Sequence, residues 1–490
     1  MNYDQTSHQG SLYELVARGV KDTYFIRDDN TSRFPYHAQY DSSAPHIAEK
    51  RSFVPLNAPK FGETMEIELE TYGDILTHVE LTVDLPTWLP TLPVIKGDGQ
   101  QVNPKTVNDL YWIRGAAGTD SSGVSYGYTN GVGYFLFEKV ELYQDQFCLQ
   151  SWSGDGLFAT SLKNGSWNSS FLEQQYCGLD KGDAINIARR ATPGRLRLKL
   201  PVVGCSGKMD TGLPLFAFPL QKLRLRIKMR KLEDLVEDSI GSIKPQPWNV
   251  SQFSYLDEND ELVVFQPIGR NTIGQPNVML TTMQEYILPE MKQLMASKMF
   301  HIPFMRMFEN VFSFGEMDYI GLDSGGTATV TRRLDGRHPS ESIVFFFRSK
   351  QVEDKNQLWN LTNEYIGSVD GEYYNQMKLV IAGQDREYDY GPTVWTDLEN
   401  HCKDGRDTGR KIGEMNWGLG SLWERREPRI KSPEGTVNFT TADRPTFHIM
   451  LQNIPSNPAD GQRRAFMRCF VMGWGVYEVA NGRGRILFTN

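Results

Sequence analysis

Apolar and charged residues alternate with a period of two along several stretches of the chain. In Leu223–Met229 every second residue is apolar, and Arg224, Arg226 and Lys228 stand between them. Because successive side chains of a strand point to opposite faces, this pattern predicts a strand with one buried and one solvated face. The same pattern recurs over 65–69, 79–85 and 196–200. The pattern predicts antiparallel sheets. The basic face of 223–229 is expected to contact solvent or another subunit rather than phosphate groups.

The second half of the chain also predicts mainly strands. The expected strands are 262–265, 327–331, 343–347, 377–381, 436–439, 447–451 and 466–479. The segment Met279–Met299 has the best helical character in this half.

The two halves share a sequence feature. Val140–Gln146 and Leu379–Asp385 both read as an apolar strand that runs into a Gln-Asp turn. A repeat of roughly 200 residues is far longer than a solenoid unit of about 20 to 50 residues, so it predicts two copies of one domain. Short strands with long connections favour a sandwich topology for each copy.

The expected organisation is an arm over 1–50, a first β domain over 51–233 and a second over 234–490, which includes the linker between them. Two long segments, Val94–Gly133 and Asp397–Arg429, are expected to project as surface loops.

The arm contains one amphipathic helix, expected over Ser11–Val20. Its apolar residues at helical spacing are Leu12, Leu15, Val16 and Val20. Docking against its own domain is favoured over insertion into a bilayer. The arm has no basic and apolar leader, and no stretch reaches the ~18 apolar residues of a membrane span, so folding in a cytosol is expected.

Composition excludes several classes of protein. The chain has 52 basic and 60 acidic residues, for a net charge of −8, whereas a protein that mainly grips nucleic acid is usually basic. Direct binding to nucleic acid is therefore not expected. The five cysteines are widely spaced, odd in number and without a C-x-x-C pair, which favours reduced thiols over disulfides or zinc. They are Cys148, Cys177, Cys205, Cys402 and Cys469.

The motif search predicts no enzyme, no cofactor and no metal. Leu322–Gly326 is similar to the nucleophile segment of chymotrypsin-like proteases, but no histidine has the matching context, so a β-turn is expected. The eight histidines are isolated, which disfavours a metal centre. The acidic cluster Asp385–Asp389 offers carboxylates for glycosidase or calcium chemistry, with solvated turn residues as the favoured alternative. Among the sequons, Asn164 and Asn168 are the best glycosylation candidates.

Motifs in order along the chain resemble those of the double jelly-roll major capsid proteins of large nucleocytoplasmic DNA viruses. The opening Gly10–Asp22 is similar to the family's Gly-x-Leu-x-x-Leu-Val-Ala-x-Gly-x-x-Asp segment. Further matches are Phe61-Gly62, Gly73–Ile75, Leu213–Leu215, Tyr255–Asp257, Gln284–Ile287, His338-Pro339, Gly435–Phe439 and Phe488–Asn490. The loops over 94–133 and 397–429 depart from the family pattern.

The resemblance implies an all-β fold of two tandem eight-stranded antiparallel jelly rolls with a short N-terminal helix. It implies a virion capsid protein made in the host cytoplasm, whose homotrimers form pseudo-hexagonal capsomers of an icosahedral shell. The implied partners are neighbouring capsomers, minor capsid and penton proteins and, through minor proteins, an inner membrane, with the Leu12 to Val20 helix on the inner face. The alternative is a glycan-binding or glycoside-processing β-sandwich protein with its site at Asp385–Asp389.

Overall fold

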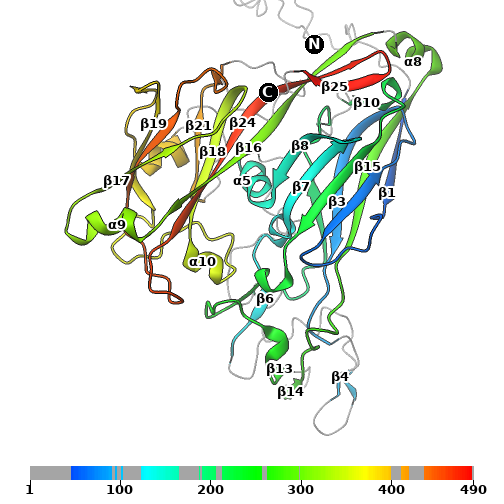
Figure 1. The fold of residues 1–490 in the computed structure, drawn as a ribbon. Helices are drawn as coiled ribbons and strands as arrows, with labels where there is room; N and C mark the ends of the chain where they lie inside the picture. Colours follow the sequence, from blue (N-terminus) through cyan, green and yellow to red (C-terminus); the bar gives the residue numbers. More distant parts are fainter. Residues whose placement is uncertain are drawn as a thin grey trace, which may run out of the picture. The chain divides into compact units, whose positions relative to one another are not determined.

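The computed structural model describes most of the chain from His46 onward. The described residues are 46–90, 94–95, 101–102, 123–164, 187, 190–205, 212–256, 262–296, 298–398, 410–418 and 435–487. They form antiparallel sheets with short helices in the connections (Figure 1).

The first pair of sheets, called the first roll, contains a five-stranded and a four-stranded sheet. The five-stranded sheet has the order β1(His46–Phe53), β15(Asn277–Ile287), β3(Ile75–Asp84) and β10(Leu213–Pro214), and β9(Arg195–Lys199) also pairs with β3. The four-stranded sheet has the order β2(Thr64–Leu69), β11(Leu223–Met229), β7(Phe137–Gln144) and β8(Phe147–Ser153). Their apolar faces share one buried cluster.

The strand β11 shows why the alternating pattern folds this way. Every second residue from Leu223 to Met229 is buried. On the other face, Arg224 and Arg226 lie opposite Glu68 and Glu66 of β2, and Arg224 Nη1 is 3.5 Å from Glu66 Oε2. Acidic residues of the neighbouring strand therefore neutralise part of the basic face.

The second pair of sheets, called the second roll, contains a six-stranded and a four-stranded sheet. The first has the order β16(Phe300–Phe314), β24(Ala465–Ala480), β18(Pro339–Ser349) and β21(Ile412–Asn416), with β22(Val437–Asn438) beside β18 and β25(Arg483–Leu487) beside β24. The second has the order β17(Ala328–Arg333), β23(Thr446–Leu451), β19(Tyr374–Ile381) and β20(Gln384–Asp385). A second buried cluster lies between them. The predicted all-β architecture is confirmed.

Smaller elements occupy the connections. Three two-stranded ribbons pair β4(Val94–Ile95) with β5(Gln101–Val102), β6(Tyr126–Tyr128) with β12(Val236–Asp238), and β13(Phe253–Leu256) with β14(Leu262–Phe265). The α-helices of the described ranges are α4(Val132–Phe135), α5(Gly154–Asn164), α8(Pro289–Ala296), α9(Glu316–Asp323) and α10(Lys350–Asp354). The remaining turns are the 3₁₀ helices η4(Leu215–Ala217), η5(Leu232–Asp234) and η6(Pro247–Asn249), and the π-helix η7(Val394–Leu398).

Both rolls contain the hairpin that the sequence indicated. In the first, Gln144 pairs with Phe147, and the turn residue Asp145 has φ of 51°. In the second, Ile381 pairs with Gln384, and the turn residues Ala382 and Gly383 have φ of 53° and 75°. Left-handed turn residues suit two-residue hairpins because their twist matches that of the strands. The second turn is therefore Ala-Gly, and the predicted Gln384-Asp385 turn is the return strand β20.

The strand β15 corrects two predictions. It pairs with β1 and β3 in the first roll, although the predicted boundary after Glu233 assigns it to the second domain. The helical character predicted for Met279–Met299 is correct only for α8, because residues 277–287 form the strand β15. Buried polar residues hid the strand pattern: Gln284, for example, is fully buried and its Oε1 accepts hydrogen bonds from the backbone nitrogens of Tyr72 and Gly73, at 3.0 and 2.8 Å. Strand β1 also begins inside the predicted arm, at His46.

The two expected surface loops are partly wrong. The end of the first, from Thr129 into α4, is buried in the first roll. The second contains β21, whose five residues are all buried as a strand paired with β18. The sequence did not indicate that these residues are buried, because the surrounding segments are rich in Gly, Asn and charged residues. Outward projection of the rest stays a prediction.

Several sequence predictions fall outside the described residues. These are the helix with Leu12, Leu15, Val16 and Val20, and the sequon at Asn168; Asn164 is the last residue of α5. Cys148, Cys205 and Cys469 are free thiols. Among the helices of the described ranges, none is long and apolar enough to cross a membrane.

Candidate functional site: the junction between the two rolls

One sheet of the second roll is buried on both faces. Along β18, Ile343, Phe345 and Phe347 belong to the core of the second roll, whereas Val344 and Phe346 pack in the same cluster as the first roll. The adjacent strand β24 contributes to both clusters in the same alternating way. A sheet covered on both faces needs a continuous apolar run, which explains the sequence Ile-Val-Phe-Phe-Phe. The junction is therefore a hydrophobic core in its own right.

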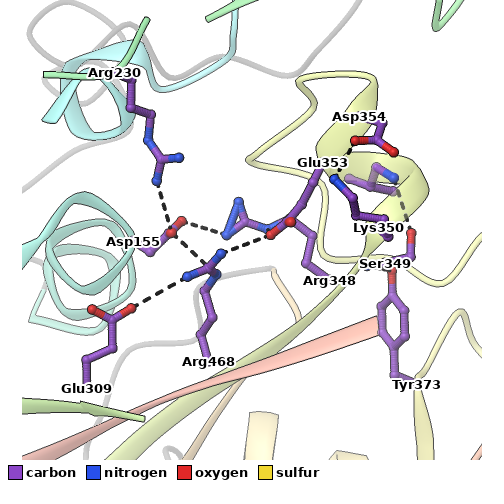
Figure 2. A network of polar contacts seen from close by, with 11 residues as sticks. Asp155, Arg230, Glu309, Arg348, Ser349, Lys350, Glu353, Asp354, Tyr373 and Arg468 are labelled. Atoms are coloured by element: carbon purple, nitrogen blue, oxygen red, sulfur yellow. Dashed lines mark hydrogen bonds and ion pairs between the residues drawn. The ribbon is translucent and has the colours of Figure 1, made fainter. Parts of the chain in front are cut away.

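A buried charge cluster lies in this junction (Figure 2). Its centre is Asp155, the second residue of α5, which is 1% exposed. Arg348 Nη2 of β18 donates to Asp155 Oδ1 at 2.6 Å, and Arg230 Nη2 donates to Oδ2 at 3.3 Å. Arg468 Nε of β24 is 3.4 Å from Oδ2. One carboxylate of the first roll therefore holds two arginines of the second.

Two further carboxylates complete the cluster. Arg468 Nη2 donates to Glu353 Oε1 of α10 at 3.0 Å, and its Nη1 is 3.6 Å from Glu309 Oε1 of β16. Three arginines thus face three carboxylates, so the cluster is neutral when all six are ionised. Buried charges are tolerated when they are paired in this way.

The arginines keep Asp155 ionised. Burial by itself raises the pKa of Asp155, but the charges of Arg348, Arg468 and Arg230 outweigh it and lower the pKa to about 2. Arg348 is completely buried, and its guanidinium lies 5.9 Å from the ring centre of Phe135 in the first roll and 5.3 Å from that of Phe346 in the second. The cation is therefore fixed by an ion pair and by two aromatic rings from opposite sides of the junction.

Neutral hydrogen bonds also join the two rolls. Asn356 Nδ2 donates to the carbonyl oxygens of Glu233 and Val236, each at 2.7 Å. Gln150 Nε2 donates to the Met305 carbonyl at 3.1 Å. These contacts join residues more than 100 positions apart, so they hold the two rolls in one relative orientation.

A cavity of about 320 Å³ opens beside the cluster. Its lining comes from both rolls: Lys139, Ser151, Ser153, Met307, Phe308, Glu309, Asp335 and Arg337. Glu309 belongs to both the cavity and the cluster. Burial and, after it, the charge of Asp155 raise the pKa of Glu309 above its ordinary value of 4.5, against the opposing effects of Ser153 and Arg468.

This raised pKa predicts a pH effect. The folded state binds a proton at Glu309 more tightly than the unfolded state does. Ionised Glu309 therefore lowers the free energy of unfolding, and this loss develops as pH rises above 4.5 through the raised pKa. We expect Glu309→Gln to remove the effect. Melting temperatures measured from pH 4 to 8 should show the wild type losing stability relative to Glu309→Gln as pH rises. Parallel profiles for the two proteins would contradict the assignment, and Glu364→Gln, at an exposed carboxylate, is the control.

The protease-like segment ends a helix. Ser324 follows α9, its Oγ donates to the Gly321 carbonyl at 3.1 Å, and Gly325 has φ of 75°. Asp323 pairs with Arg463, 2.7 Å away. The expected turn is present at the helix C-terminus, where the Gly325 backbone nitrogen donates to the Leu322 carbonyl at 3.1 Å and the left-handed glycine closes the helix.

The acidic cluster Asp385–Asp389 is neutralised locally. Lys378 Nζ is 3.2 Å from both Asp385 and Asp389, and Glu387 accepts a hydrogen bond from Trp417 Nε1 at 2.9 Å. Within the described ranges, no group of three or more His, Cys, Asp or Glu residues is arranged to hold a metal ion. The geometry adds no support for the glycan alternative.

The charge cluster was missed at the sequence level, although it left a signal. Arg348 ends an unbroken apolar run, and Arg468 stands between Met467 and Cys469 in another. An arginine inside a strand buried on both faces needs a buried acid as partner. The partner, Asp155, lies 193 positions away between two glycines at the start of α5, so no local pattern identifies it.

Solved structures with the same arrangement come from viruses. No family model and no curated protein matches the chain. VP54 of PBCV-1, fitted into a reconstruction of the virophage Sputnik, matches with a TM-score of 0.64 at 12% identity, over 92% of this chain and 99% of that chain. The Faustovirus major capsid protein matches with a TM-score of 0.60 at 11% identity, over 94% of each chain. The fold is a double jelly roll. At such identities the likeness shows the fold, and the double jelly roll expected from the sequence is confirmed.

Proposed function

We propose that this chain is the major capsid protein of an icosahedral double-stranded DNA virus. The observation that carries the proposal is the double jelly roll itself, matched over nearly the whole of this chain and of VP54. A second PBCV-1 match, with a TM-score of 0.60 at 11% identity over 92% of this chain and 99% of that chain, is a quasi-atomic model of the virus capsid. The junction, with its buried core and charge cluster, supports the same function. A shell subunit must keep its two rolls at a fixed angle under the forces exerted by neighbouring subunits.

The finer features of this proposal follow from the resemblance. The chain forms homotrimers, the trimers act as pseudo-hexagonal capsomers, and minor capsid and penton proteins join them in a virion assembled in the host cytoplasm. The N-terminal segment with Leu12, Leu15, Val16 and Val20 contacts partners on the inner face. The sheet memberships of β15 in the first roll and β16 in the second support a division between domains at α8. The chain has no catalytic role.

A mass measurement tests the trimer. Light scattering after gel filtration is expected to give three times 55.9 kDa for the purified chain, with no dissociation at micromolar concentration. Electron microscopy of the same peak should show particles with pseudo-sixfold outlines. A strictly monomeric chain of 55.9 kDa would contradict the proposal.

A further inference from the structure

The helix α8 connects the two rolls at one end of the fold (Figure 1). None of its residues is buried, and it contacts η4 of the first roll. Lys292 Nζ is 2.5 Å from Asp74 Oδ1, and the backbone nitrogen of Ile287 donates to Asp74 Oδ2 at 3.2 Å. Asp74 thus fixes the helix in place while its outer side faces solvent.

Exposed large apolar side chains lie on this helix and on segments that adjoin it. Leu288 and Met299, which flank α8, are 44% and 60% exposed, and Leu294 within it is 56% exposed. Leu220, just beyond η4, is 83% exposed, and Ile47, which pairs with Tyr286 just before the helix, is 72% exposed. These five residues form the α8 patch. The fold gains little from apolar groups left in water, and clustered exposure of this kind marks an interaction surface.

The charges at the two ends of α8 complement each other. Glu290 lies in the first turn and Lys298 lies just past the last. Within the described part of the chain, no ion pair joins Glu290 or Lys298 to another residue, whereas Lys292 is engaged by Asp74. Glu290 and Lys298 are each four positions from Leu294 in sequence, on opposite sides of it. A second α8 placed antiparallel across an axis at Leu294 brings Glu290 against Lys298 twice.

We propose that the α8 patch is a two-fold contact between two copies of this chain, with the α8 helices antiparallel and Glu290 of each copy against Lys298 of the other. In such an isologous contact the same patch serves both copies, which the symmetric charge pattern and the central apolar residues satisfy. The inference rests on the proposed function, because in a shell this contact joins two neighbouring capsomers while other surfaces form the trimer.

Charge exchange tests the contact. Glu290→Lys alone sets lysine against lysine, and Lys298→Glu alone sets glutamate against glutamate, so each is expected to weaken association of the two copies by about tenfold at low salt. The double variant Glu290→Lys/Lys298→Glu restores both pairs and is expected to return association to within about threefold of wild type. Sedimentation of the full chain over a range of concentrations measures each association constant. Equal association by all four proteins, or a double variant no better than the singles, would overturn the proposal.

Further variants separate this contact from other interpretations. Glu364→Lys changes a charge paired within the chain to Lys355 and should leave association unchanged. Met299→Asp, in the apolar part of the patch, should abolish the two-fold contact. If the wild-type copies do not associate but bind phosphatidylcholine vesicles, and Met299→Asp removes that binding, the patch contacts lipid and the proposal is wrong. Trimers whose further association does not depend on the charge exchange would refute this inference alone, whereas a charge-dependent dimer without trimers would refute the proposed capsomer alone.

Discussion

Asp155→Asn is expected to lower the free energy of unfolding by about 3 to 5 kcal/mol, because it leaves buried arginines without their shared carboxylate. Arg348, completely buried, loses the partner of its 2.6 Å hydrogen bond, and Arg468 keeps only the two glutamates. Asparagine has nearly the same volume, so the loss isolates charge from packing. Chemical denaturation followed by tryptophan fluorescence measures the difference.

A surface carboxylate supplies the matched control. Asp385→Asn removes one partner of Lys378, but the pair is exposed and Asp389 remains 3.2 Å from the same amine, so the expected change is below about 1 kcal/mol. Adding Arg348→Met to Asp155→Asn should recover part of the lost stability. The double variant no longer buries the Arg348 charge without its carboxylate partner. An Asp155→Asn protein as stable as the Asp385→Asn control would show that the cluster does not lock the junction.

The same cluster predicts resistance to acid. A carboxylate whose folded pKa is lowered contributes stability above its unfolded pKa, near 3.8, and loses that contribution only as pH falls through the folded value of about 2. Asp155 therefore stays ionised through the whole range in which Glu309 changes its charge. Acid therefore weakens the ion pairs of Asp155 only as pH falls towards about 2.

Strands whose buried positions are apolar were predictable from the sequence, and β15, whose buried positions are partly polar, was not. The alternation in β11 is unambiguous because water covers one side of its sheet. In β15, by contrast, the buried positions include Thr282 and Gln284, which satisfy their polar groups through distant backbone and side-chain partners. Period-two reasoning depends on polar residues being outside, so it fails where they are inside and hydrogen-bonded.

The junction was beyond local reasoning for a different cause. Its contacts join α5 to β18 and β24, which are roughly 200 to 300 positions apart, and pairing over such distances is decided by the fold as a whole. A resemblance carried by scattered short motifs identified the two rolls correctly. The resemblance contained no information on Asp155, because that residue lies outside all of these motifs.

Gly154→Ala is expected to destabilise the protein by more than about 3 kcal/mol, through overlap with backbone atoms at the start of α5. A Cβ on Gly154 would overlap the carbonyl oxygens of Phe137 and Tyr134, and neither can rotate away. The helix must then shift, and Asp155, the next residue, moves with it out of its arginine cluster. In an unobstructed helix the same substitution stabilises by roughly 0.5 to 1 kcal/mol, so the expected sign is opposite to helix propensity.

A second glycine of α5 and an unobstructed glycine elsewhere distinguish the backbone overlap from a general intolerance of α5 to alanine. Gly156→Ala would press on the thioether of Met307, a flexible side chain that can adopt another rotamer, so its expected cost is smaller, about 1 to 2 kcal/mol. Gly269→Ala meets nothing within 4 Å and should change stability by less than about 0.5 kcal/mol. The unfolding midpoint is therefore expected to be highest for Gly269→Ala, lower for Gly156→Ala and lowest for Gly154→Ala. The melting temperature of Gly154→Ala could instead equal or exceed that of Gly156→Ala. In that case the backbone of Phe137 does not fix the start of α5, and the arginines alone hold Asp155 in its cluster.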